Sequence, residues 1–172
     1  MTTFDLRTLR LRPGDERQLE QEVELDGLEL GGQKYLPEPL VAPAELSVAQ
    51  AVGGRLLGLR FAARLTGPCM RCLAPAVLEL RLRASEYDDQ REGARPDGDE
   101  TTIYVEDDVL DLSQWAHDEV ALALPEQILC RAACAGICPQ CGKDLNLEPH
   151  THDDVVADPR WQALADIRDQ LA

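Results

Sequence analysis

The chain has 172 residues, which is enough to bury one core of ordinary size and favours a single domain over residues 1–172. Its formal net charge of -15 argues against a protein that binds nucleic acid over its whole surface, because phosphate contacts need clustered Lys and Arg. No apolar run approaches the about 18 residues of a membrane span, and the residues after Met1 lack the basic-then-apolar order of a secretory signal, so we expect a cytoplasmic protein.

Residues 1–87 show the alternation of apolar and polar side chains that is typical of strands with one wet face. Residues 4–11 and 19–30 carry this alternation in a weak form, and it is strongest in residues 44–87. Within that stretch, Gly53 and Gly54 mark a hairpin turn. The first half of the chain is therefore predicted to form an antiparallel sheet.

Arginines alternate with the apolar residues in the two strongest predicted strands. If these strands pair across the turn between them, the outer face of the sheet should carry Arg60, Arg64, Arg81 and Arg83. Residues 51–84 hold six arginines and one acid, whereas residues 85–119 hold thirteen acids and two arginines. Either the arginines meet RNA phosphates or an acidic partner, or they are neutralised within the molecule and face water. Both interpretations stay open.

Residues 88–100 separate the strand-rich half from residues 101–172. They are acidic and rich in Gly and Pro, which is typical of a mobile loop. A short strand is predicted at residues 102–105. At the other end of this half, the apolar spacing that follows Pro159 predicts a terminal helix over residues 158–171.

A longer helix is predicted between these two elements. It should begin at a cap formed by Asp111 or Ser113, run for about twelve residues and end before Pro125. Its buried side is expected to comprise Leu112, Trp115, Ala116, Val120, Leu122 and Leu124. The expected fold class is therefore α+β, with a curved antiparallel sheet followed by a C-terminal helical region.

All six cysteines fall in two places along the chain, as Cys69 and Cys72 and then as Cys130, Cys134, Cys138 and Cys141. Without a secretion signal, such clustering favours a metal over disulfides, because the cytoplasm keeps thiols reduced. A Cys-x-x-Cys turn directs two thiolates at one ion, and zinc is the ion that such turns most often bind. We therefore expect a zinc site that staples the sheet to the C-terminal region.

Three ligand sets are open. Knuckle geometry favours the two Cys-x-x-Cys turns, which gives Cys69, Cys72, Cys138 and Cys141. The second set is Cys69, Cys72, Cys130 and Cys134, and the third is Cys130, Cys134, Cys138 and Cys141. His150 and His152 are able to replace a thiolate, but we expect them to be surface residues of a polar tail.

The metal is expected to be structural. A zinc ion with four cysteine ligands has no open position for an activated water. A redox role for Cys69 and Cys72 would need a thiolate at a helix N-terminus, whereas this pair lies in a turn between predicted strands. The sequence shows no phosphate-binding loop, zinc-protease motif or nucleophile elbow, and His117 stands alone. We therefore expect that the chain is not an enzyme.

The order of these features closely resembles the bacterial YceD family of large ribosomal RNA subunit accumulation proteins. The resemblance rests on a Cys-x-Arg-Cys-Leu turn at residues 69–73, Glu-Tyr at 86–87, Leu-Pro at 124–125 and the cysteine run at 130–141. It continues with Gly-Lys-Asp-Leu-Asn at 142–146 and Asp-Pro-Arg at 158–160. The match covers roughly the whole chain, and the ordered combination is far more specific than one Cys-x-x-Cys motif.

The resemblance implies a part in the accumulation or processing of large-subunit ribosomal RNA, with no catalytic residues to carry over. The implied partner is the ribosomal RNA precursor or a basic ribosomal protein, since the acidic chain suits the latter at least as well. Two other hypotheses are a zinc-ribbon adaptor in transcription or another assembly, and a thiol-redox enzyme.

Overall fold

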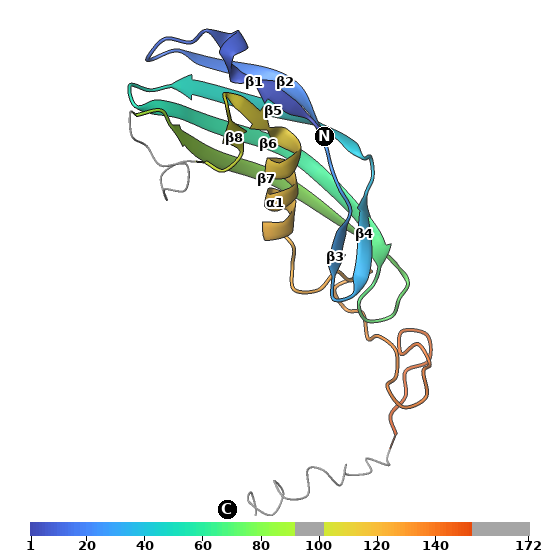
Figure 1. Ribbon diagram of the computed structural model, residues 1–172. Coiled ribbons are helices and arrows are strands. Elements are labelled where there is room, and N and C mark those ends of the chain that lie inside the picture. Colours follow the sequence, from blue (N-terminus) through green and yellow to red (C-terminus); the bar gives the residue numbers. More distant parts are fainter. Residues whose placement is uncertain (92–101, 153–172) are drawn as a thin grey trace, which may run out of the picture. The chain divides into compact units, whose positions relative to one another are not determined.

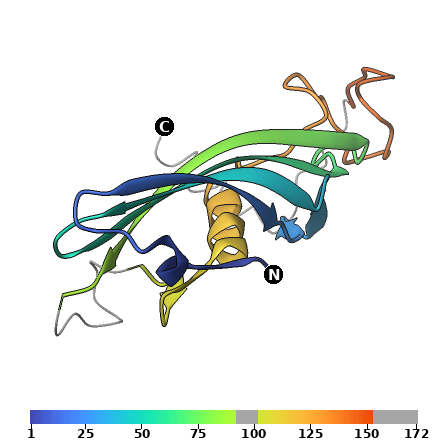
Figure 2. The ribbon, with the colours of Figure 1, turned by 90° about the horizontal axis from the view of Figure 1, so that it is seen from above.

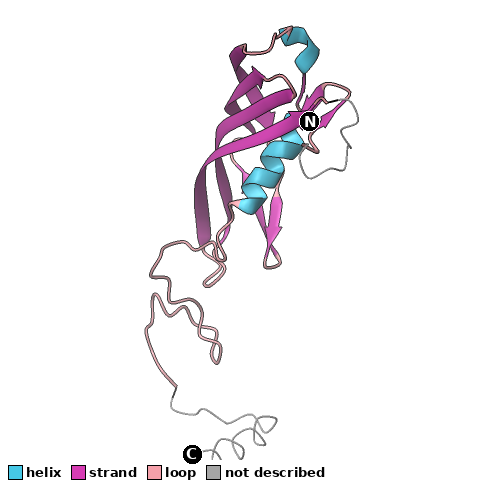
Figure 3. Cartoon of the chain, turned by 90° about the vertical axis from the view of Figure 1, so that its left-hand side faces the viewer, coloured by secondary structure: helices cyan, strands magenta, loops and turns pink. Residues whose placement is uncertain are grey.

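The computed structural model describes residues 1–91 and 102–152, which belong to two compact units. The first unit is Met1–Cys134. The second begins at Ala135, and its described residues end at His152. Within the described residues, every named helix and strand lies in the first unit (Figure 3). None of the helices described is both long enough and apolar enough to span a membrane.

A six-stranded antiparallel sheet forms the body of the first unit (Figure 1). Its long strands lie in the order β2 (Glu16–Glu24), β5 (Val41–Gln50), β6 (Gly54–Pro68) and β7 (Pro75–Asp89). A hairpin of β3 (Leu28–Leu30) and β4 (Gln33–Pro37) pairs with the far end of β6. The predicted hairpin at Gly53 and Gly54 joins β5 to β6, so the strand-rich first half is confirmed.

The alternation in β6 decides which face of the sheet is buried. Leu57, Leu59 and Leu65 are fully or almost fully buried, while Arg60 and Arg64 between them are exposed. Successive side chains of a strand point to opposite faces, so the leucines form the core face and the arginines the wet face. The predicted polarity of this strand is thereby confirmed.

A small three-stranded sheet lies beside the main one, in the order β1 (Thr3–Asp5), β9 (Val109–Asp111) and β8 (Val105–Glu106). The extended segment expected at residues 4–11 is wrong beyond Asp5, because Leu6–Leu9 forms a 3-10 turn, η1. The Asp5 carboxylate caps that turn by accepting a hydrogen bond from the Arg7 amide. The strand expected at residues 102–105 begins only at Val105.

The helix α1 (Leu112–Leu122) packs against the core face of the main sheet, which curves around it (Figure 2). Leu112, Trp115, Ala116 and Val120 are buried, as predicted. Leu122 is 81% exposed, which contradicts its predicted place on the buried side. The helix ends at that residue, so Leu124, which was also expected on the buried side, lies outside the helix and is half-buried.

The N-terminal cap of α1 supports a stability prediction. Asp111 has extended backbone, and its carboxylate accepts a hydrogen bond of 2.9 Å from the Gln114 amide. Replacing Asp111 with alanine removes the acceptor and should lower the free energy of unfolding by about 1 kcal/mol. Urea denaturation followed by circular dichroism measures this loss, and Asp111→Asn, which keeps an acceptor, should show little of it. Equal losses in both variants would contradict the capping role.

The structure tests the four remaining sequence predictions to different extents. The α+β class holds, since the described residues are mostly antiparallel sheet with one α-helix. The predicted loop at 88–100 is wrong at its start, because Asp88 and Asp89 belong to β7, and residues 92–100 lie outside the described residues. The terminal helix at 158–171 also lies outside them. A single domain over the whole chain stays a prediction.

Candidate metal centre

The turn between β6 and β7 forms a knuckle around Cys69. The Leu73 amide donates a hydrogen bond of 3.0 Å to the Cys69 carbonyl, and the Cys69 amide donates one of 2.7 Å to the Ala74 carbonyl. Leu73 has a left-handed backbone with a φ of 62°. This local geometry reverses the chain within a few residues, and the Arg71 amide donates a hydrogen bond of 3.5 Å to the Cys69 sulfur.

A second segment, residues 127–134, returns to this knuckle after α1. The Met70 amide donates a hydrogen bond of 2.9 Å to the Ile128 carbonyl, and Ile128 itself is buried. The Arg71 guanidinium donates to the Gln127 side-chain oxygen at 3.0 Å and to the Cys134 carbonyl at 3.1 Å. These bonds hold the segment in place through protein groups alone. Arg71 therefore positions the second cysteine pair, a role that its place in the Cys-x-Arg-Cys motif could have suggested.

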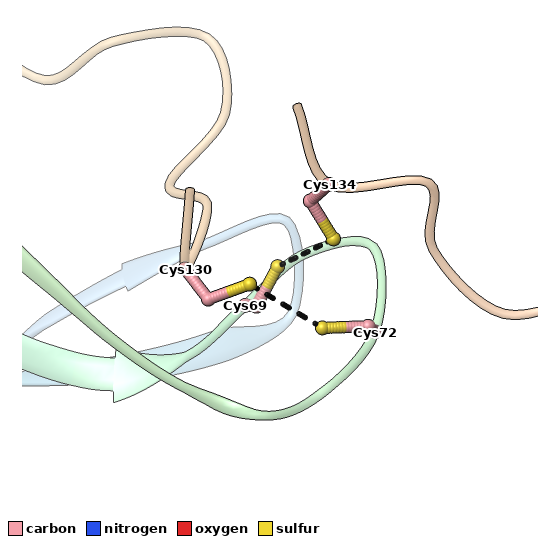
Figure 4. A group of neighbouring side chains, drawn as sticks. All are labelled: Cys69, Cys72, Cys130 and Cys134. Carbon is pink, nitrogen blue, oxygen red and sulfur yellow. Dashed lines mark hydrogen bonds between the residues drawn. The ribbon is translucent and has the colours of Figure 1, made fainter. Parts of the chain in front are cut away.

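Four thiols meet where the two segments touch. The Sγ atoms of Cys69 and Cys134 are 3.8 Å apart, and those of Cys72 and Cys130 are 3.6 Å apart (Figure 4). All four sulfurs lie within 4.8 Å of one another. Four thiolates at about 2.3 Å from one tetrahedral zinc would be roughly 3.8 Å apart. All four cysteines are free thiols, with sulfurs well beyond the disulfide bond length of about 2.05 Å. The donor set and its spacing therefore suit a metal ion.

The electrostatics of the cluster also suit a cation. Burial raises the pKa of the Cys69 thiol, but the backbone N–H groups of Arg71, Cys130 and Cys72 outweigh it and lower the pKa to about 6. The neighbouring Cys72 sulfur, by contrast, raises the pKa of Cys130. One thiolate is thus favoured, while further ones repel each other. A bound divalent cation would remove this repulsion and allow all four to ionise.

The structure groups the cysteines differently from the ligand set favoured from the sequence. The structure brings Cys69 and Cys72 together with Cys130 and Cys134, which is the second of the three sets. Cys138 and Cys141 instead lie with His150 and His152 in the second unit, again with one donor atom from each residue within 4.8 Å of the others. The knuckle motif identified the two cysteine turns correctly but carried no information on which distant segment completes each one.

The four predicted surface arginines lie on the wet face of β6 and β7, as expected. Arg60 is 3.5 Å from a Glu45 carboxylate oxygen, and Arg64 is 3.5 Å from one of Glu38. For Arg81 and Arg83 the described residues supply no ion pair. Ion pairs among the described residues therefore neutralise Arg60 and Arg64, and both interpretations stay open for Arg81 and Arg83.

A buried ion pair that the sequence reasoning missed ties the main sheet to the β8–β9 turn. The guanidinium of Arg55, which is 7% exposed, contacts the Asp88 carboxylate at 2.6 Å and that of Asp108 at 2.7 Å. Arg55 shares the parity of Leu57 and Leu59, so a charge at a core position was the available signal. The three residues fix the end of the sheet that is remote from the cysteines.

The chain is similar to a known family and to several mycobacterial proteins. The family model described as large ribosomal RNA subunit accumulation protein YceD matches residues 57–168. The chain is 34% identical over 172 residues to uncharacterized protein Rv2926c of Mycobacterium tuberculosis, and the match covers 96% of this chain and 80% of the relative. The same values hold for uncharacterized protein Mb2951c of Mycobacterium bovis.

A third relative, uncharacterized protein ML1660 of Mycobacterium leprae, is 42% identical over 65 residues, which is 37% of this chain and 29% of that protein. No solved structure matches the chain. The residues that the family model matches include both cysteine knuckles, β7 and the four-cysteine cluster. The family model matches more than half of the chain, and the first two relatives match nearly all of it. The chain therefore belongs to the YceD family of large ribosomal RNA subunit accumulation proteins.

Proposed function

We propose that this chain is a non-enzymatic ribosome-biogenesis factor that supports the accumulation or processing of large-subunit ribosomal RNA. The observation that carries the proposal is the family match over residues 57–168, because the family is named for that role. The match includes the four-cysteine cluster and the arginines of β7. The proposed function therefore has two physical parts, a metal site and a basic surface.

Zinc is the proposed ion of the cluster. Four sulfurs at tetrahedral spacing suit a borderline-soft cation, and Zn²⁺ is the usual one in proteins. Cys69 and Cys134 are buried, and four thiolates would fill the coordination sphere, so no position remains for a reacting water. The ion would staple the β6–β7 turn to the segment after α1. This staple supports a structural role and gives no support to the thiol-redox alternative.

The wet face of the sheet is the proposed contact surface. Across one row of the sheet, Glu20 pairs with Glu45, Glu45 with Arg60, and Arg60 with Arg83, so the row runs from acidic to basic. Arg60 and Arg83 are directly opposite each other, an arrangement of like charges that costs stability. An anionic ligand over β7 would relieve that cost. An RNA phosphate backbone meets this requirement. The acidic edge at β2 would repel phosphates and so confine the contact to the arginine side of the sheet.

Sedimentation with precursor large-subunit particles tests this surface. The variant Arg81→Glu/Arg83→Glu should lose particle binding at low salt, and the slope of affinity against salt should fall by about one unit for each phosphate that the protein no longer neutralises. A matched control, Arg12→Glu/Arg17→Glu, makes the same charge change on exposed arginines elsewhere and should bind normally. Equal loss of binding in both variants would show that the change in net charge alone explains the effect, and it would contradict the proposed surface.

The same assay separates the alternatives. Loss of binding in Glu20→Gln/Glu22→Gln, with the arginine variant unaffected, would favour a basic ribosomal protein as the partner at the β2 edge. Absence of any particle binding would favour the zinc-ribbon adaptor. A metal-free protein with reactive thiols would favour the redox enzyme, so zinc content and protection of the thiols from alkylation are measured on the same material.

A further inference from the structure

The second unit contains a knuckle with the same hydrogen bonds as the first. The Gly142 amide donates a hydrogen bond of 2.9 Å to the Cys138 carbonyl, and the Cys138 amide donates one of 2.8 Å to the Lys143 carbonyl. The offsets along the chain are those of the turn at Cys69. Gly142 has a φ of 73° where Leu73 has 62°, so the backbone follows the same path. Each turn is therefore built to present two thiolates to an ion.

This unit lacks an apolar core within its described residues. Among residues 135–152, only Gly136 and Cys138 are buried, and neither supplies a large apolar side chain. Polar contacts hold the segment, such as the bond of 2.8 Å from the Ala135 amide to the Asn146 side-chain oxygen. Small units without a core depend on a metal or on disulfides for their fold. The cysteines here are free thiols, which leaves a metal.

His150 is oriented as a metal ligand. Its Nδ1 lies 2.7 Å from the Glu148 carbonyl, a pure acceptor, so Nδ1 carries the proton and donates it. The lone pair of the ring is then on Nε2, which lies 3.1 Å from the Cys141 sulfur. A histidine that binds a metal through Nε2 and donates Nδ1–H to a backbone carbonyl is the usual arrangement at zinc sites. The ring of His152 is 4.9 Å from that of His150, between centroids.

The distance between the knuckle and His150 also suits a zinc ion. For a tetrahedral zinc, a sulfur at about 2.3 Å and a nitrogen at about 2.0–2.1 Å would be roughly 3.5 Å apart. The distance of 3.1 Å between Cys141 and His150 is close to that value, so a small outward movement accommodates the ion.

We propose that the chain carries two separate zinc sites, and that the second is formed by Cys138, Cys141, His150 and His152. All four donor atoms lie within 4.8 Å of one another, and the set matches the two-cysteine, two-histidine chemistry that zinc favours. The ion would take the place of a core among residues 135–152, the described part of this unit. The site is independent of the four-cysteine cluster, because every ligand lies after Ala135.

Native mass spectrometry of the full chain tests the second site. The wild type should carry two zinc ions, and His150→Ala/His152→Ala should carry one fewer ion. The matched control is His117→Ala, which removes a histidine of α1 that belongs to neither cluster and should leave the metal content unchanged. His150→Cys on the wild-type background should keep the second ion, because a thiolate is able to replace the imidazole. Unchanged metal content in the histidine double variant would overturn the proposal.

Cobalt substitution distinguishes the two sites. Absorption from thiolate-to-cobalt charge transfer grows with the number of sulfur ligands, so the four-cysteine site should contribute about twice as much as the mixed site. The histidine double variant should lose the smaller contribution, and Cys69→Ser/Cys134→Ser should lose the larger. If only the cysteine variant changes the spectrum, the second site fails while the first stands. If only the histidine variant does, the first site fails and the second stands.

Discussion

Replacing Cys69 with serine should release one metal ion and lower the free energy of unfolding of the Met1–Cys134 unit by about 3–5 kcal/mol. The Cys69 side chain is fully buried, and serine is a poor zinc ligand that leaves its hydroxyl in an apolar site. Structural zinc contributes about 10–16 kcal/mol in small zinc fingers. The expected loss is smaller here because the sheet has its own core, with Leu57, Leu59 and Leu65 at its centre.

Thermal unfolding followed by circular dichroism, together with zinc analysis, measures this effect. At about 2–4 °C for each kcal/mol in a chain of this size, the melting temperature should fall by roughly 10 °C. A chelator should reproduce the shift in the wild type and add little to Cys69→Ser. Cys138→Ser is the matched control, since it removes a thiolate of the other group and should leave the sheet's transition in place. A Cys69→Ser protein with an unchanged transition would contradict a structural metal at this site.

The second large effect is expected at the opposite end of the sheet. Replacing Arg55 with alanine should cost about 3–5 kcal/mol, because the Asp88 carboxylate is left buried without its partner. Arg83→Ala removes an exposed arginine from the same sheet and should change stability by less than about 0.5 kcal/mol. Urea denaturation of both variants measures the difference.

A double variant identifies the cause of that loss. Arg55→Met/Asp88→Leu removes both charges and fills the space, so it should be clearly more stable than Arg55→Ala. Asp108 retains access to water and does not need a replacement partner. If the double variant is as unstable as the single one, packing of the arginine stem, and not an unpaired carboxylate, accounts for the loss.

Much of the site could be predicted from local patterns. The knuckle at Cys69 depends on bonds between near neighbours in the chain, so a Cys-x-x-Cys motif is sufficient to identify it. The wet-face arginines follow from the period of two in a strand, and register then places Arg60 opposite Arg83. His150 and His152 were visible in the sequence as possible donors, and the structure brings one donor atom of each within 4.8 Å of the thiols of Cys138 and Cys141.

The sequence by itself determined that the chain is a strand-rich α+β protein with cysteine knuckles and an arginine face, because each of these depends on neighbours along the chain. Only the tertiary structure decided that Cys130 and Cys134, and not Cys138 and Cys141, complete the first cluster. That choice is made by Met70 and Arg71, which hold residues 127–134 against the turn after a helix has brought the chain back. The burial of Asp88 beside Arg55 was also decided by the tertiary structure. Contacts between distant segments depend on packing and produce no periodic pattern of residues in the sequence.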